Sequence, residues 1–159
     1  MKVLVIGESC KDVYNYGACS RLCPEAPVPV FNSIKLIENG GMAMNVYNNL
    51  LSLGAQPDIK TNENWQSITK TRFVDMRTNH MFMRLDNNDT QYGTTDLSAV
   101  QFESYDAVIV SDYNKGYLSE SDIQMISQKS KLSFLDSKKI LGSWAENFTF
   151  IKINNFEYE

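Results

Sequence analysis

Short apolar runs along the chain predict the strands of a parallel sheet. Residues 2–6 and 106–111 are rich in Val and Ile and end at Gly7 and Ser111, as buried strands of a parallel sheet do. Residues 132–135 and 148–153 are two further strand candidates of the same kind.

A different, helical spacing of apolar residues separates these strands. Residues 43–50 carry apolar side chains three and four apart and stop before Gly54, which predicts a helix. Ser119 followed by Asp122 has the pattern of a capping box, so a second helix is predicted after it. A short helix is also predicted near residues 141–145. The alternation of strands and helices predicts an α/β fold with a mainly parallel, Rossmann-like sheet.

Two extended segments do not fit that alternation. Residues 28–37 alternate partially, and the prolines before them predict an edge strand. Residues 71–77 and 81–86 read as a hairpin around Thr78. We expect both segments to form a small projecting β-sheet lid, within a single domain of residues 1–159 whose lid segments are about 13–39 and 69–90.

Composition narrows the possible partners. The 159 residues carry 15 Lys and Arg against 19 Asp and Glu, a net charge of −4, which argues against a nucleic-acid partner because that binding needs clustered positive charge. No apolar run approaches the roughly 18 residues of a membrane span, and the first residues lack a signal-peptide pattern, so we predict a cytoplasmic protein without a membrane partner.

The cysteines predict free thiols. Cys10, Cys19 and Cys23 are an odd number, and the single histidine, His80, lies far along the chain. A disulfide framework or a four-ligand zinc site is therefore not expected.

Polar residues follow each predicted strand, at the edge of a parallel sheet where ligands bind. Gly40 and Gly41 precede a helix, whose amino end favours oxygen-rich ligands. Such residues also form ordinary turns, so the pattern alone names no substrate. The residues after the strands are Asp12, Asp112, Tyr113, Lys115, Asp136, Lys138, Asn154 and Glu157.

Six ordered segments resemble one protein family. Residues 21–30 (RLCPEAPVPV) resemble an R-x-S-P-E-A-P-V-P-V stretch, and residues 40–45 (GGMAMN) resemble a glycine-pair signature. Residues 111–116 (SDYNKG) are similar to S-D-Y-x-K-G. The other matches are residues 69–72 with 84–86, residues 136–138, and an N-x-x-E at 154–157. Together they resemble the ribokinase-like (PfkB-type) carbohydrate kinase family, in its heptose 7-phosphate kinase subgroup.

The resemblance implies roles for particular residues. Asp12 and Asn45 would bond sugar hydroxyls, and Gly40 and Gly41 would let the lid close. Lys70, Arg72 and Arg84 are candidates for a substrate phosphate, although lid cations can also be merely solvated. Asp112 and Lys115 would line the cleft between sugar and nucleotide. Asn154 and Glu157 would organise the water shell of Mg²⁺ near ATP, and the lid would pair with a second subunit's lid in a homodimer.

The sequence also departs from the family pattern. No Gly-Ala-Gly-Asp string, which in the family carries the catalytic base, occurs in these residues, and only fourteen residues separate Gly54 from Thr69. Tyr47 replaces a small residue near the sugar pocket. We therefore predict no useful kinase activity for the isolated chain. It is either the amino-terminal part of a sugar kinase or a catalytically silent sugar-phosphate-binding or dimeric scaffold. An unrelated nucleotide-binding domain is disfavoured because the G-x-G-x-x-G pattern is absent.

A shortened sheet has a further consequence. It would expose an apolar edge and face, and such surfaces are usually covered by a partner. The chain is thus expected to be at least a homodimer.

Overall fold

The larger of two sheets is entirely parallel. The computed structural model describes residues 1–90 and 92–154. Its first sheet has five strands in the order β4-β1-β7-β8-β9. Their bounds are Gln56–Lys60 (β4), Lys2–Gly7 (β1), Ala107–Asp112 (β7), Ser133–Ser137 (β8) and Phe150–Lys152 (β9). The strands β1 and β7 lie inside the sheet and are buried along most of their length, as their Val and Ile content predicts.

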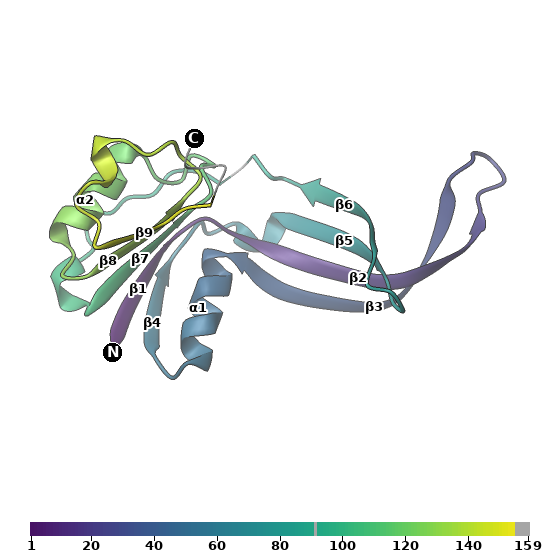
Figure 1. The fold of residues 1–159 in the computed structure, drawn as a ribbon, viewed down its shortest axis with the longest axis horizontal. Coiled ribbons are helices and arrows are strands. Elements are labelled where there is room, and N and C mark those ends of the chain that lie inside the picture. The colour runs from purple at the N-terminus through teal and green to yellow at the C-terminus, as the bar shows by residue number, and fades with distance from the viewer. Residues whose placement is uncertain (91, 155–159) are drawn as a thin grey trace.

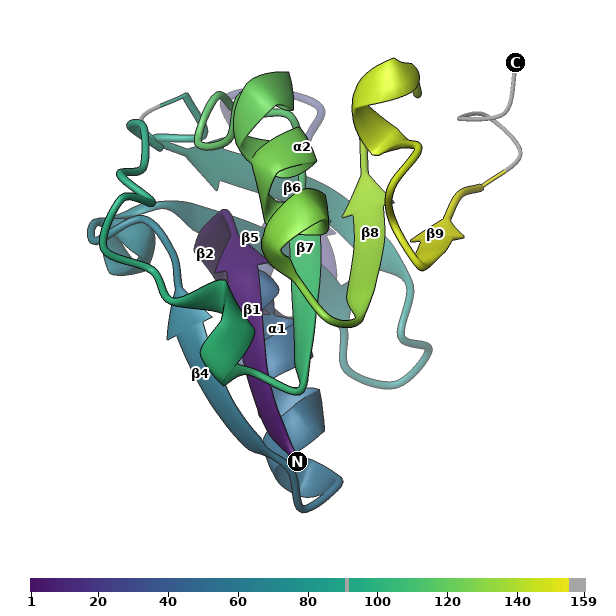
Figure 2. The same cartoon turned by 90° about the vertical axis from the view of Figure 1, so that its left-hand side faces the viewer.

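One helix lies on each face of this sheet (Figure 2). The helix α2 (Glu120–Lys129) begins at the predicted capping box, in which Ser119 and Asp122 bond each other's backbone N–H groups. Its Ile123 and Ile126 pack into the main core with Phe102. The helix α1 (Ala43–Ser52) lies on the opposite face and contacts β4, β1 and β7.

The second sheet is the lid, which extends away from the first (Figure 1). Its strand order is β3-β2-β5-β6, with β2 parallel to β5 and the other pairs antiparallel. Only Glu8 separates β1 from β2, so the lid sheet continues directly from an inner strand of the parallel sheet. The bounds are Pro29–Met42 (β3), Ser9–Leu22 (β2), Thr69–Asp75 (β5) and Met81–Asn87 (β6).

The predicted fold class is confirmed, with two strands added. The lid edge strand begins at a proline, and residues 69–87 form the predicted hairpin. The expectation that Asp12 lies in a loop after the first strand was wrong, because β2 continues through it. The strand β4 was also not predicted. It holds Pro57, which a sheet tolerates at its edge, and β4 pairs only with β1 among the described strands.

Three smaller findings complete the fold. Short 3₁₀ turns occupy Trp65–Ser67, Phe102–Ser104 and Ser143–Ala145, the last of them where a short helix was predicted. The three cysteines are free thiols. No helix in the described part of the chain is long and apolar enough to cross a membrane.

Candidate functional site

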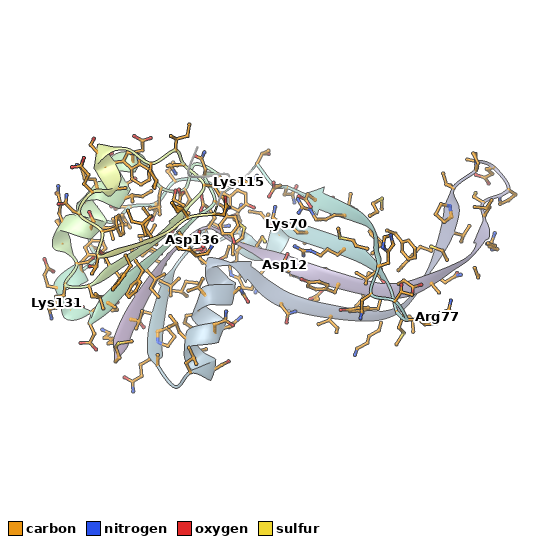
Figure 3. All side chains as sticks on the ribbon, in the orientation of Figure 1. Asp12, Lys70, Arg77, Lys115, Lys131 and Asp136 are labelled. Carbon is orange, nitrogen blue, oxygen red and sulfur yellow. The ribbon has the colours of Figure 1, made fainter. Side chains whose placement is uncertain are left out.

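The register of the lid strands places five charged side chains on one lid face. Asp12 pairs with Lys70 across β2 and β5, and Lys70 pairs with Asp86 across β5 and β6. Arg72 and Arg84 are paired two residues further along. Because side chains alternate between the faces of a strand, these residues share the face that turns toward the parallel sheet. Figure 3 shows Asp12 and Lys70 at the junction of the two sheets, with Lys115 across from them.

A cleft of about 340 Å³ lies at this junction. Five of the residues predicted to bind substrate line the cleft. One of these five, Lys115, reaches the cleft from the loop after β7. Cations outnumber carboxylates among the lining residues, which suits an anionic ligand. The lining residues are Cys10, Asp12, Met42, Lys70, Arg72, Arg84, Asp89, Tyr113, Lys115 and Lys138.

Asp12 and Arg72 form an ion pair in the wall of the cleft. Arg72 donates from Nη1 to Asp12 Oδ1 at 2.6 Å, and its guanidinium lies 5.0 Å from the centre of the Tyr14 ring. Burial lowers the pKa of Arg72, but the bond to Asp12 outweighs it and the pKa is raised, so Arg72 is a permanent cation. A side chain at Gly41 would bring a Cβ within 2.5 Å of Asp12 Oδ2, so any other residue there would displace the Asp12 carboxylate from this position.

Asp89 joins the lid to the parallel sheet. Its Oδ1 accepts from Lys70 Nζ and, at 2.7 Å, from the Tyr92 hydroxyl, while its Oδ2 accepts from Lys115 Nζ at 2.6 Å. Burial raises its pKa, but the bonds from Lys115, Lys70 and Tyr92 prevail and hold the pKa of Asp89 well below its usual range. Its ionised form therefore contributes stability at neutral pH that is lost as the pH falls below the ordinary Asp pKa.

Glu8 anchors the loop after β7 and the first residue of α1. Its carboxylate is fully buried and accepts the backbone N–H groups of Tyr113 at 2.8 Å and Lys115 at 3.0 Å. Its carbonyl oxygen accepts the N–H of Ala43 at 2.9 Å, at the first residue of α1. A single residue thus ties the glycine pair's helix to the loop that carries Lys115.

Other predicted residues lie outside the cleft lining. Gly40 lines a separate hollow beside Trp65, and Asn45 is exposed on the first turn of α1. Asp112 is buried, and Lys139 Nζ donates to both of its oxygens at 2.8 and 2.9 Å. That carboxylate is committed to an internal ion pair.

The end of β9 was expected to face Mg²⁺ and ATP. Asn154 is exposed there, and Glu157 lies outside the described residues. Within residues 1–90 and 92–154, no cluster of three or more His, Cys, Asp or Glu side chains could hold a metal ion. The role of Asn154 and Glu157 in holding hydrated Mg²⁺ stays a prediction.

Sequence reasoning missed the buried acid and the joining carboxylate. Glu8 directly follows the first strand, and that position was its only signal. Asp89 follows two asparagines and resembles an ordinary turn residue. Cys10 was assigned only as a free thiol, yet it lines the cleft, where burial and Asp12 raise its pKa to about 11 and keep it neutral.

Known sequences resemble almost the whole chain. No family model matches it. The Bifunctional protein HldE of Helicobacter acinonychis is 31% identical over 194 positions, which cover 99% of this chain and 42% of that protein. HldE of Helicobacter pylori strain 26695 is 34% identical with the same coverage. The chain therefore spans well under half the length of these relatives.

Solved structures share the fold at low sequence identity. A Staphylococcus aureus putative phosphofructokinase has a TM-score of 0.56 at 12% identity, over 95% of this chain and 58% of that one. Thermotoga maritima ribokinase has a TM-score of 0.54 at 9% identity, over 98% of this chain and 60% of that one. The chain therefore has a ribokinase-like fold. Its sequence is similar to part of the HldE proteins.

Proposed function

We propose that the chain is a sugar kinase-like protein whose cleft binds a phosphorylated sugar, of the heptose 7-phosphate type. The observation that carries this proposal is the convergence of Asp12, Lys70, Arg72, Arg84 and Lys115 on one cleft beneath the lid. The similarity to the HldE proteins supports the choice of sugar.

The cleft offers matching chemistry for the two ends of such a ligand. A phosphate dianion is held best by Lys and Arg donors, and Lys70, Lys115 and Arg84 supply them. Asp12 presents its second oxygen beside Gly41, where it accepts from a sugar hydroxyl. In the free protein, internal carboxylates already pair these cations, so the phosphate has to compete with Asp89 for Lys70 and Lys115.

The alternative within this proposal is binding without catalysis. These 159 residues contain no Gly-Ala-Gly-Asp string. A base that takes the hydroxyl proton contributes roughly 10²–10⁴-fold to rate. We expect the chain by itself to bind the sugar phosphate without transferring a phosphoryl group from ATP, with Asn154 and Glu157 supporting Mg²⁺ only when the remaining parts of a nucleotide site are present.

Titration calorimetry with heptose 7-phosphate and with inorganic phosphate tests the binding site. The Asp12→Ala variant is expected to lose about tenfold or more of the preference for the sugar phosphate over inorganic phosphate, because only the sugar offers hydroxyls to Asp12. Asp106→Ala is the matched control, since Asp106 bonds the N–H of Lys2 at 2.7 Å at the opposite end of the sheet.

Two outcomes would contradict the proposal. One is the absence of sugar-phosphate binding by the unaltered chain, and the other is an equal loss of preference in the control. An ATP-dependent phosphotransfer assay on the same sample separates the alternatives, because turnover near about 1 s⁻¹ would show a competent kinase.

We also propose that the outer face of the lid pairs with a second copy of the chain. Leu36 and Leu85 lie on the face opposite Arg72 and are 59% and 45% exposed. Met83, which pairs with Phe73 and is 54% exposed, extends this apolar surface on the same face. Exposed apolar surface of this kind is typical of protein–protein contacts.

Light scattering coupled to gel filtration tests the dimer. Leu36→Glu is expected to convert a dimer into a monomer, because a buried unpaired carboxylate opposes the contact. Leu51→Glu, at an exposed position of α1, is expected to leave the dimer intact. A monomeric unaltered chain would refute the lid dimer.

A further inference from the structure

One carboxylate of the cleft is shared by lysines from both sheets. Asp89 Oδ1 accepts a hydrogen bond from Lys70 Nζ of the lid strand β5, and Asp89 Oδ2 accepts one from Lys115 Nζ, in the loop after β7, at 2.6 Å. The Tyr92 hydroxyl also donates to Oδ1, at 2.7 Å. The two ammonium groups that the proposed function assigns to a phosphate are therefore already bonded to an anion of the chain itself.

The two lysines are held at the cleft independently of Asp89. Lys70 lies within the strand ladder of the lid, where it pairs with Asp12 on β2 and with Asp86 on β6. The backbone N–H of Lys115 donates to the buried Glu8 carboxylate at 3.0 Å, which fixes the loop after β7. Removal of the Asp89 carboxylate therefore leaves both ammonium groups within reach of the cleft. This placement argues against a role for Asp89 as their support.

Asp89, by contrast, lies in a turn beyond the ladder. The strand β6 ends at Asn87, and Asn88 has a φ of 58°, in the left-handed region where a strand cannot continue. The side chain of Asp89 is 22% exposed. Its position thus depends on its side-chain hydrogen bonds, and the carboxylate can turn toward solvent when another anion replaces it.

The charge of Asp89 makes it a competitor for any anionic ligand at neutral pH. Burial raises its pKa, but the hydrogen bonds from Lys115, Lys70 and Tyr92 lower the pKa well below its usual range, so the carboxylate is ionised. An incoming anion must replace two charge-assisted hydrogen bonds that are already formed within the chain. A monoanionic carboxylate offers no more than Asp89 does, whereas a phosphate dianion brings a second charge and a third oxygen.

We propose that Asp89 is an internal competitor for the phosphate-binding position: its carboxylate bonds Lys70 and Lys115 until a phosphate takes both lysines, and it then turns aside. The competition weakens the binding of every anion and sets a threshold that a sugar phosphate passes and a sugar carboxylate does not. This inference rests on the proposed function, because it explains which anionic sugars the same cleft admits.

Titration calorimetry of the 159-residue chain with inorganic phosphate tests the competition. Asp89→Asn is expected to bind phosphate about tenfold more tightly than the unaltered chain, because the lysines remain and the opposing charge is gone. D-Gluconate, a sugar monocarboxylate, should bind the unaltered chain at least about tenfold more weakly than phosphate does, and should gain affinity in the variant.

Asp96→Asn is the matched control, because it makes the same change of charge outside the cleft lining. Asp96 Oδ1 accepts the N–H of Ser98 at 2.8 Å. Phosphate affinity of this variant should stay within about twofold of the unaltered chain, since a remote exposed charge acts only through the screened field.

Tyr92→Phe tests the same idea without any change of charge. The variant removes the hydroxyl that donates to Asp89, so the carboxylate is held less firmly. Phosphate affinity should rise by about threefold, which is less than in Asp89→Asn. Urea unfolding shows whether each variant is folded, and Tyr92→Phe decides the question if Asp89→Asn does not fold.

Two results would overturn the proposal. One is a folded Asp89→Asn or Tyr92→Phe variant that binds phosphate no more tightly than the unaltered chain, because Asp89 would then support the lysines. The other is gluconate binding that equals phosphate binding in the unaltered chain or is unchanged in Asp89→Asn. The proposed function fails by a different result, which is an unaltered chain without preference for heptose 7-phosphate over inorganic phosphate; a gain of phosphate affinity in Asp89→Asn would still stand.

Discussion

Replacing Glu8 by alanine is expected to lower the free energy of unfolding by about 2–5 kcal/mol. The carboxylate is fully buried, and its removal leaves the backbone N–H groups of Tyr113 and Lys115 without their acceptor. A hydrogen bond to a charged group contributes about 1.5–3 kcal/mol, and two are lost here; both are only part-buried, so water replaces some of this contribution. Chemical denaturation in urea, with the two unfolding curves extrapolated to water, measures the difference.

The effect should extend from stability to the cleft. Without Glu8 the loop after β7 loses its anchor, so Lys115 is no longer held against Asp89 and sugar-phosphate affinity falls in the folded variant. Glu8→Gln retains one acceptor oxygen and should fall between the alanine variant and the unaltered chain. Glu103→Ala, at an exposed position, should change stability by less than about 0.5 kcal/mol. Equal stability of Glu8→Ala and Glu103→Ala would refute the anchoring role.

The inner strands β1 and β7 of the parallel sheet could be predicted because they are buried along most of their length. The runs at β1 and β7 consist of Val, Ile and Ala with few polar interruptions, so composition alone identifies them. The helix α2 could be predicted from Ser119 and Asp122, whose reciprocal bonds are local. Elements that are stabilised by residues close together in the sequence can therefore be predicted from the sequence.

The strand β2 could not be predicted in the same way. Its residues 9–22 mix Asp, Asn, Gly and Ser, and few of its side chains are buried. What holds this segment extended is pairing on both sides, with β3 and with β5, whose partner residues lie far away in the sequence. Its strand character therefore depends on a ladder that no local pattern shows. The strand β4 could not be predicted either, because it contains Pro57.

The residues of the candidate site also fall into those that could be predicted and those that could not. The rule that ligands bind beyond the carboxyl ends of parallel strands brought Lys115 into the prediction, and the family resemblance supplied the lid cations. Asp112 satisfied the same rule, yet its carboxylate is turned inward to Lys139. Glu8 and Asp89 hold other residues of the site in place. Such a role could not be predicted because the partners, such as Lys70, Asp89 and Lys115, are far apart in the sequence and meet only in the folded chain.

Replacing Arg72 by methionine is expected to weaken both sugar-phosphate and inorganic phosphate binding by about 100-fold. The variant removes a permanent cation from the cleft and also leaves Asp12 without its ion-pair partner at 2.6 Å. The unpaired Asp12 carboxylate then repels the phosphate, so the loss exceeds that of one hydrogen bond. Breaking one side of a partly buried charge pair costs about 2–5 kcal/mol, which corresponds to this range of affinity.

Arg77→Met is the matched control for this experiment, because Arg77 carries the same charge at the far end of the lid hairpin (Figure 3). Its effect on calorimetric affinity should be small and should disappear at higher salt, since a remote exposed charge acts only through the screened field. Arg72→Met combined with Asp12→Ala should recover part of the affinity for inorganic phosphate, because the repelling carboxylate is then gone too. If the double variant binds inorganic phosphate no better than Arg72→Met, the ion pair does not govern the charge of the cleft, and Arg72 acts only by supporting the lid.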